Sequence, residues 1–413
     1  MSKRDFPIFA ENPGMIYLDS AATAQKPWFV LAWITDYLSR DYANVHRGEY
    51  PLSFRSEDRF WAWREAVAAW MDVDPAEVVF TGSGTDASNK LVSALFFSSM
   101  IQPWDRLMVS MVEHHANIVP WQIFAERYGC EIVWIPVSSD WAVDLHWLQE
   151  HYDHRVRVVA ISAASNVTGV LTDIPAVHAL LHEQTYLVVD ASQAIVHSPV
   201  LPNQWGADFC WWTGHKIGAL TGIGVLRWKK AHLERLQPMR WWWWAIMTVW
   251  VDGYMLQASP DKFEPWTPNL VWVVSLDLAL QYLRTWSRAH WEDGTVAWFY
   301  RALHAYESPL FSYIFEQCAL LEDAGVVLLG SREYSKKIWV FSMRIPSLVD
   351  RGFGAYCGAR NIAIRCWWLC AQPFHDQHGL TQWTCRISTW LYTDIDELEK
   401  FFAVVQEFLW RNP

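Results

Sequence analysis

Short apolar runs alternate with amphipathic stretches along the first two thirds of the chain. Runs rich in β-branched and aromatic residues predict strands, and they lie at residues 78–80, 106–110, 131–136, 156–161, 186–190, 208–212 and 224–228. Helical patterns separate several of these runs, after Thr85, near Trp121 and near Ala176. Strands that alternate with helices predict βαβ units, so we expect a large α/β domain with a mainly parallel sheet.

The two ends of the chain have different patterns. Near the start, a short strand is predicted within residues 15–24, and helices are predicted at 27–39 and 56–71. After about residue 280 a long helical stretch over 286–315, broken near Pro309, precedes strand-like runs at 326–329, 338–343, 362–365 and 384–388 and a last helix at 394–409. We therefore expect a large domain over 1–280 and a smaller α+β domain over 281–413, with residues 1–40 packed against the smaller domain.

Charge and cysteine content limit the class of protein. Lysines and arginines number 33 against 44 acidic residues, a formal net charge of −11. This balance argues against nucleic acid or an anionic membrane as a partner, because both attract basic surfaces. The first residues contain no apolar export signal, and an odd count of seven cysteines favours free thiols. We expect a soluble protein of the cytoplasm.

Tryptophan is unusually abundant, with 30 residues. Several occupy turn-like contexts, as in Gln102-Pro-Trp-Asp105 and Glu264-Pro-Trp-Thr-Pro268. Turns of this kind usually carry glycine or asparagine, which tolerate left-handed backbone. We therefore expect local strain where tryptophan takes such a position.

Two predicted strands end next to residues with chemical potential. The run at 186–190 ends on Asp190, and the run at 208–212 leads through Thr213-Gly-His to Lys216. Carboxyl ends of strands in an open α/β sheet face the ligand crevice. Pyridoxal phosphate (PLP) needs a lysine for a Schiff base and a carboxylate for its ring nitrogen. Most lysines after strands are ordinary surface residues, and such aspartates often cap turns, so spacing alone does not identify the cofactor.

A series of motifs does point to a family. In chain order they are Glu113-His-His-Ala-Asn-Ile-Val-Pro-Trp121, Ser165-Asn-Val-Thr-Gly169, Val189-Asp-Ala-Ser-Gln193, Gly214-His-Lys216 with Thr221-Gly-Ile-Gly224, Thr267-Pro-Asn269 and Cys370-Ala-Gln-Pro373. Together they resemble the cysteine desulfurases of the Suf/Csd type, which are class V aminotransferase-like enzymes of PLP fold type I. The similarity extends from Tyr17 to Ser388, nearly the whole chain.

The resemblance implies roles around the PLP ring. Lys216 would hold PLP as a Schiff base and later move the α-proton of the substrate, because a cationic, partly desolvated site lowers the pKa of an amine. Asp190 would pair with the ring nitrogen, and Gln193 would bond the phenolic oxygen. His114 would stack on the ring, and Asn166 would reach a cofactor oxygen or the substrate carboxylate.

The resemblance also implies residues for the phosphate and the substrate. Thr85, Thr213 and His215 would hold the phosphate, with Thr267 contributed by the partner subunit of a homodimer. Arg386 would bind the substrate carboxylate as a bidentate fork. His46 and Arg47 would also contact the substrate.

Cys370 is the expected nucleophile. In the family this thiolate attacks the sulfur of the bound substrate, which releases L-alanine from L-cysteine and leaves a persulfide for a sulfur-acceptor protein. L-Selenocysteine is a second possible substrate, and iron–sulfur cluster assembly is the implied use. Cys130, Cys210 and Cys318 lie among apolar residues and are expected in the core. Cys366 has no metal-binding spacing, and no metal site is predicted.

The chain departs from the family pattern at several loops. Asp86 stands in the phosphate loop, where a negative charge ~4 Å from a phosphate would cost about 4 kcal/mol. Tryptophans fill expected glycine positions at 241–244 and 266, Ala219 and Leu220 alter the turn after the lysine, and residues 366–369 lack the expected glycine and histidine. Indole cannot replace glycine where backbones approach closely. We therefore expect weaker PLP retention and impaired catalysis.

Two alternatives remain open. Another class V reaction, of the kynureninase or aminotransferase kind, needs no nucleophilic thiol, so Cys370 argues against it. A cofactor-free scaffold protein would use exposed tryptophans to bind a partner. Another class V reaction should not depend on Cys370, and a scaffold protein should not depend on Lys216, whereas a desulfurase needs both residues.

Overall fold

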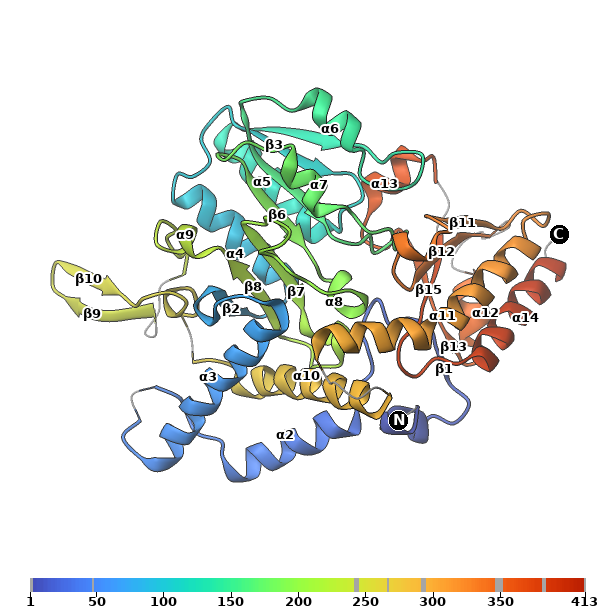
Figure 1. The fold of residues 1–413 in the computed structure, drawn as a ribbon, viewed down its shortest axis with the longest axis horizontal. Helices are drawn as coiled ribbons and strands as arrows, with labels where there is room; N and C mark the ends of the chain where they lie inside the picture. The colour runs from blue at the N-terminus through green and yellow to red at the C-terminus, as the bar shows by residue number, and fades with distance from the viewer. Residues whose placement is uncertain are drawn as a thin grey trace.

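A seven-stranded mixed sheet forms the centre of the computed structural model (Figure 1). The structure describes residues 3–46, 48–240, 245–265, 267–290, 295–345, 352–380 and 384–411. Strands β3 to β7 are mutually parallel, whereas β8 is antiparallel to both of its neighbours. In spatial order the strands are β2 (Val78–Thr81), β8 (Gly224–Trp228), β7 (Phe209–Thr213), β6 (Tyr186–Asp190), β5 (Val156–Ser162), β3 (Arg106–Ser110) and β4 (Glu131–Ile135).

The predicted α/β class and mainly parallel sheet are confirmed, and only the direction of β8 was not anticipated. The segment between β7 and β8 contains the short helix η4 (Gly214–Ile217) and ten residues in all, Gly214 to Ile223. A parallel crossover needs a dozen residues or more, so this connection returns the chain antiparallel. The tight return places Lys216 directly beyond the end of β7.

Helices cover both faces of the large sheet. Their buried side chains form two clusters, one on each face, because successive residues of each strand point to opposite sides. Val188 and Trp211 belong to one cluster, and Val189 and Trp212 belong to the other. The covering helices include α4 (Gly84–Phe97) and α5 (Val119–Tyr128) on one face and α2 (Trp28–Arg40), α3 (Pro51–Met71), α8 (Ala194–His197) and α10 (Leu270–His290) on the other.

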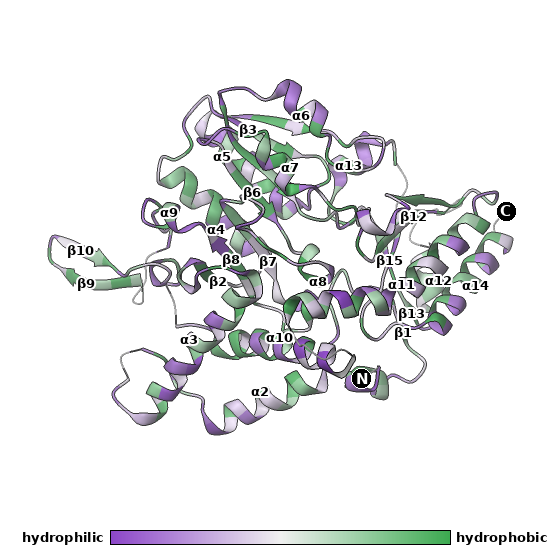
Figure 2. Cartoon of the chain, in the orientation of Figure 1, coloured by the Kyte–Doolittle hydropathy of each residue, from purple (hydrophilic) through white to green (hydrophobic). Residues whose placement is uncertain are grey.

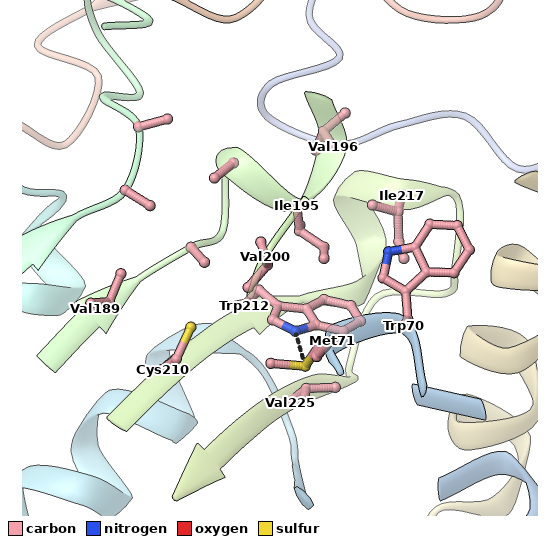
Figure 3. Packing of buried hydrophobic residues seen from close by; sticks show 14 of the residues in the cluster. Trp70, Met71, Val189, Ile195, Val196, Val200, Cys210, Trp212, Ile217 and Val225 are labelled. Carbon is pink, nitrogen blue, oxygen red and sulfur yellow. Dashed lines mark hydrogen bonds between the residues drawn. The ribbon is translucent and has the colours of Figure 1, made fainter. Parts of the chain in front are cut away.

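Many of the tryptophan side chains are buried in the hydrophobic core. The side chains of Trp70, Trp121, Trp211, Trp212, Trp228, Trp286 and Trp390 are almost completely buried. Figure 3 shows Trp212 beside Met71 in the packed core, where its indole N–H donates to the sulfur of Met71 at 3.2 Å. The fold therefore accommodates these large side chains by packing them between sheet and helices.

Tryptophan has the expected strain in the predicted turn over Gln102–Asp105. Trp104 has a left-handed φ of 75° and a side chain that is 77% exposed. A non-glycine residue in this region is uncommon, so the prediction for the Gln102–Asp105 turn is confirmed. The other predicted positions, residues 241–244 and 266, lie outside the described residues.

The C-terminal part forms a second, smaller sheet. Its four strands are all antiparallel to their neighbours, in the order β11 (Val327–Leu329), β12 (Val340–Arg344), β15 (Thr384–Ser388) and β14 (Arg365–Trp367). A third apolar cluster joins this sheet to α11 (Val296–Leu320), α12 (Gly352–Gly358) and α14 (Ile395–Arg411). The N-terminal segment meets this part, because β1 (Ile16–Tyr17) pairs in parallel with β13 (Ile362–Ala363). The remaining helices include α1 (Pro7–Glu11), α6 (Leu145–His151), α7 (Ile174–Ala179), α9 (Lys230–Leu233) and α13 (Gln372–Gln377).

The predicted helix over 286–315 was wrong in its limits. Two helices occupy the region, and α10 begins at Leu270, so the expected domain boundary at residue 280 falls inside a helix. Helix α11 continues across Pro309. Proline removes one backbone hydrogen bond from a helix, but the buried side chains of Leu310 and Phe311 hold the following turn against the core. Likewise, α3 begins at Pro51 rather than at residue 56, because proline suits the first helical position.

A two-stranded hairpin projects from the large domain at the left of Figure 1. It comprises β9 (Ile246–Trp250) and β10 (Gly253–Leu256), and no strand was predicted there. Its colouring in Figure 2 is largely apolar, and Val249, Val251 and Tyr254 are exposed. Among the described residues, no helix combines the length and apolar character that crossing a membrane requires.

Candidate active site

A cavity of about 330 Å³ opens where the ends of β5, β6 and β7 meet the start of α4. Its walls also include the end of β14 and the turn that follows. Ten of the predicted site residues line it: Lys216, Cys370, His114, Asp190, Gln193, Thr85, Asn166, Thr213, His215 and Arg386. Segments more than 300 residues apart therefore converge on one cavity.

The other three predicted residues lie elsewhere. Thr267 lines a second hollow of about 390 Å³ together with Arg240 and Glu264. His46 is buried, and its Nδ1 lies 2.9 Å from a carboxylate oxygen of Glu57. Arg47 lies outside the described residues.

Asp190 and Lys216 form the floor of the cavity. Asp190 is the last residue of β6, and its Oδ1 accepts a hydrogen bond from the Ser192 amide at 2.8 Å. Lys216 is half-buried in η4, and this desolvation lowers its pKa to about 8, although the negative charge of Asp190 opposes the shift. The next residue, Ile217, is buried in the core seen in Figure 3, which fixes the backbone that presents the lysine.

His114 faces the same floor as a neutral imidazole. Its Nδ1 accepts a hydrogen bond from the Ala116 amide at 3.1 Å, so the ring carries its proton on Nε2. Burial, followed by the positive charge of Lys216, lowers its pKa to about 4. At neutral pH this flat, uncharged ring can pack against a heterocycle and donate from Nε2.

Glu113 is a buried acid beside the site that sequence reasoning missed. Its carboxylate accepts from the Ser162 amide at 2.7 Å and from the Asn117 side chain at 2.6 Å, and the hydroxyl groups of Ser110 and Ser162 also donate to it. Burial raises its pKa to about 7. These bonds join the ends of β3 and β5. The signal was present in Glu113-His114, where only the histidine received a role.

The first turn of α4 provides a polar end to the cavity. Ser83 caps the helix by accepting from the Asp86 amide at 3.0 Å, and Ser83, Gly84 and Thr85 all line the cavity. A helix N-terminus attracts anions because its amide groups point outward unpaired. Thr213 and His215 lie on the same walls, and burial lowers the pKa of His215 to about 4.

The prediction that Asp86 places its charge at this anion site was wrong. Its Oδ2 accepts from the Gly82 amide at 2.9 Å, and the side chain lines the second hollow. Its other oxygen lies 3.9 Å from the guanidinium of Arg240. The carboxylate turns away from the cavity because it caps the loop before the helix.

A pair of arginines forms the opposite wall. Arg386 is 3% exposed, and its guanidinium donates to the backbone oxygen of Asn166 at 2.9 Å and to Asp19 at 3.4 Å. Burial lowers its pKa, but the shift leaves an arginine protonated at neutral pH. Arg365 stands opposite it on β14 and binds Asp19 through two nitrogens, at 3.1 and 2.8 Å. Sequence reasoning placed Arg365 at a strand end without giving it a role.

The loop that carries Cys370 lies at the mouth of the cavity. The side chain of Cys370 is exposed, and both Leu369 and Cys370 have left-handed φ angles, 53° and 55°. Three hydrogen bonds hold the loop. Cys370 O accepts from the His115 amide at 2.7 Å, Leu369 O accepts from the Asn166 side chain at 2.6 Å, and His115 Nε2 accepts from the Gln372 amide at 3.1 Å.

Metal ligands do not gather in the described parts of the chain. No group of three or more histidine, cysteine, aspartate or glutamate side chains there is arranged to hold a metal ion. All seven cysteines are described, and all are free thiols. The ionisable groups that line the cavity are the amine of Lys216, the thiol of Cys370, the imidazoles of His114 and His215, the carboxylate of Asp190 and the guanidinium groups of Arg365 and Arg386.

Comparisons with known proteins agree with this geometry. The family model described as Aminotransferase class-V matches residues 16–401. A probable cysteine desulfurase of Vibrio cholerae is 33% identical and covers 96% of this chain and 94% of its own. A cysteine desulfurase of Pectobacterium atrosepticum is also 33% identical, with 98% and 96% covered.

Solved structures give the same result. The apo cysteine desulfurase of Thermococcus onnurineus has a TM-score of 0.88 at 26% identity, and the cysteine desulfurase CsdA of Escherichia coli has 0.83 at 29%. Each comparison covers 98% of this chain and 97% of the other. A C-DES variant with glycine covalently linked to its PLP cofactor shares the fold at 19% identity, with a TM-score of 0.79 over 98% of this chain and 99% of its own.

Proposed function

This chain belongs to the class-V aminotransferase family, and we propose that it is a PLP-dependent cysteine desulfurase. It converts L-cysteine to L-alanine and passes the sulfur, held on Cys370 as a persulfide, to a sulfur-acceptor protein. The observation that carries the proposal is the convergence of Lys216, Arg386 and the exposed Cys370 on one cavity. L-Selenocysteine fits the same chemistry as a second substrate.

The cavity fits PLP in its chemistry. Gln193 Oε1, His215 Nδ1 and Arg386 Nε are buried polar atoms without a hydrogen-bond partner among the described residues. Such atoms cost free energy unless a ligand satisfies them. Lys216 and Asp190 would hold the aldehyde end and the ring nitrogen, and the start of α4 with Thr213 would hold the phosphate. PLP supplies the electron sink that lets bonds at the α-carbon of an amino acid break.

The floor residues hold and move protons. With a pKa of about 8, the Lys216 amine exists partly in its neutral form at neutral pH, so it can accept a proton and return it. Asp190 places a carboxylate near the ring site, and neutral His114 offers a proton from Nε2. Because their environments differ, Lys216 can act as the base and His114 can act as a proton donor.

The arginine wall and the thiol position the substrate. Arg386 has an unpaired Nε and binds the substrate carboxylate, while Arg365 keeps Asp19 engaged beside it. The Cys370 thiolate then bonds to the sulfur of the substrate as the carbon–sulfur bond breaks, and the carbon gains a proton to give alanine. Because Cys370 is exposed, the resulting persulfide lies within reach of an acceptor protein.

The family resemblance and the free cysteines suggest the oligomeric state and the location of the protein. The homodimer, with Thr267 facing the partner subunit, follows from the resemblance, as do a cytoplasmic location and a role in iron–sulfur cluster assembly. Free thiols at all seven cysteines fit a reducing compartment. The two-domain division near residue 280, and the impairment expected from residues 241–244 and 266, remain predictions of the sequence.

Replacement of the thiol tests the proposed function. Cys370→Ala should abolish alanine formation from cysteine while the PLP absorbance band persists, because the substituted residue lies at the mouth and not on the floor. Cys130→Ala is the matched control, since that thiol is half-buried and lies outside the cavity. Alanine formation at the parental rate in Cys370→Ala would instead favour a class V reaction without a thiol. A protein with no PLP band before or after PLP is added would be a scaffold.

A further inference from the structure

Sulfur atoms are concentrated in the core of the small sheet, behind the cavity. Cys357, Cys385, Cys318 and Met343 are buried in its apolar cluster, and half-buried Cys366 packs against them. Cys318 lies with its sulfur 3.7 Å from that of Met343. The desulfurase reaction uses none of these side chains, since none of them lines the cavity.

Cys366 and Cys385 face each other across two paired strands. They are direct partners in the antiparallel register of β14 and β15, and their side chains belong to the same apolar cluster. Directly opposite residues of such a pair have Cα atoms roughly 4.5–5.5 Å apart. A disulfide needs a Cα separation of roughly 4.4–6.8 Å, so the register already supplies the required distance.

The two thiols differ in their access to solvent. Cys385 is completely buried, whereas Cys366 is half-buried. Gly354 lies beside Cys366, and a Cβ atom added to this glycine would be 3.5 Å from the Cys366 sulfur. Because glycine has no side chain, nothing at position 354 beyond its backbone covers the thiol. Burial raises the pKa of Cys385. Cys366 is therefore the thiol that a reagent from solvent meets first, and Cys385 is the resolving thiol behind it.

We propose that Cys366 and Cys385 form a reversible disulfide when the protein meets a low-molecular-weight disulfide. The Cys366 thiolate attacks one sulfur of the reagent and forms a mixed disulfide, which releases one small thiol. The Cys385 thiolate then attacks the Cys366 sulfur and releases the second small thiol. Two protein thiols are oxidised, one small disulfide is reduced, and the two protons pass to the released thiolates.

This disulfide would join two strands that serve the active site. Arg365 and Arg386, the residues directly before Cys366 and directly after Cys385, are also register partners and line the cavity on the other face of the sheet. β14 ends at Trp367, three residues before Cys370. The modification site is therefore tied to the arginine wall and to the start of the thiol loop, and it does not rest on the proposed reaction.

The test maps disulfides after oxidation. The full chain carrying Cys370→Ser, which removes the exposed thiol, is incubated with glutathione disulfide, alkylated and digested for mass spectrometry. A peptide pair linked through Cys366 and Cys385 is expected, and dithiothreitol should reverse it. Cys366→Ser should abolish the link, whereas Cys130→Ser, which changes the other half-buried thiol, should leave it intact.

Three outcomes would overturn the proposal. They are a link from Cys366 to Cys357, glutathione retained on Cys366 without resolution, and both thiols alkylated as in the untreated protein. Amide hydrogen exchange provides a second measurement on the folded chain. Exchange in β14 should slow at least tenfold after oxidation and recover on reduction. Unchanged exchange in a linked protein would show that the link forms only after unfolding, which also contradicts the proposal.

Discussion

The floor of the cavity and its mouth are built in different ways. Asp190 and Lys216 on the floor are set by the ends of buried strands and by a short helix whose Ile217 is locked in the core. Cys370 at the mouth lies on an exposed turn with two left-handed residues and is held by three hydrogen bonds. Core packing fixes the floor, whereas a few polar contacts fix the mouth.

This difference teaches where substitutions are tolerated. Left-handed backbone costs roughly 1–2 kcal/mol per residue for an L-amino acid, and Leu369 and Cys370 both adopt it. The contacts from His115 and Asn166 offset that cost at the mouth. Changes on the floor should therefore lower activity strongly, and changes in the residues that hold the mouth loop, other than Cys370 itself, should weaken it gradually.

Apart from Cys370 itself, the largest expected effect is on the floor. Lys216→Ala should lower alanine formation by about 10²–10⁴-fold, the usual contribution of a general acid or base. The variant should also lose PLP on dialysis, because no covalent link holds it. Activity and the absorbance spectrum are measured together, with exposed Lys230→Ala as the control. If the variant retained both activity and PLP, Lys216 would neither hold PLP nor transfer the proton.

The second prediction concerns the protonation of that lysine. Because burial lowers its pKa to about 8, about half of the Lys216 amine is neutral at pH 8 in protein freed of PLP. An ordinary lysine with a pKa of about 10.4 is then neutral in roughly 0.4% of molecules, a difference of about 100-fold. Acylation of Lys216 should rise with pH and level off above about pH 9. A midpoint near 10 for Lys216 would contradict the prediction.

The third prediction addresses the mouth. His115→Ala removes the acceptor for the half-buried Gln372 amide, and the loss of such a hydrogen bond costs about 0.5–1.5 kcal/mol. We expect kcat/KM to fall about tenfold with PLP retained, since each 1.36 kcal/mol is a factor of ten. His115→Gln keeps an acceptor and is the matched control. Loss of the PLP band would mean that His115 supports the floor instead.

The smallest effect is expected at Asp86. Asp86→Asn retains an oxygen that accepts from the Gly82 amide and removes a charge that faces the second hollow. PLP affinity, measured by absorbance titration, should change by less than about threefold, or roughly 0.7 kcal/mol. A tenfold or greater gain in affinity would restore the original prediction of charge repulsion at the phosphate.

The sequence predicted the floor well because strand periodicity carries that information. Apolar runs that end on Asp190 and before Thr213 mark strand ends, and the structure places both at the cavity. The chemical roles came from the resemblance and not from the pattern. The antiparallel return of β8 was missed because a run of apolar residues carries no sign of strand direction.

Other features depend on the direction in which a side chain points, and the spacing of residues along the sequence does not predict that direction. The cap at Ser83 orients the first turn of α4 so that Asp86 points back to Gly82, although its position in the loop suggested the opposite. Glu113 and Arg365 were missed because their partners, Ser162 and Asp19, are distant in sequence. A break was expected in the helical stretch near Pro309, and tertiary packing outweighed the local cost of the proline.

The contact between Asp19 and Arg365 has a consequence for how the protein is made. The two residues are separated by 346 positions, and the parallel pairing of β1 with β13 spans a similar distance. At about 5–20 residues per second, a nascent chain carries Asp19 for roughly 17–70 s before Arg365 is synthesised. The floor strands are complete long before that moment. A ribosome-bound chain can therefore shape most of the large sheet early, yet it acquires its arginine wall only at the end of translation.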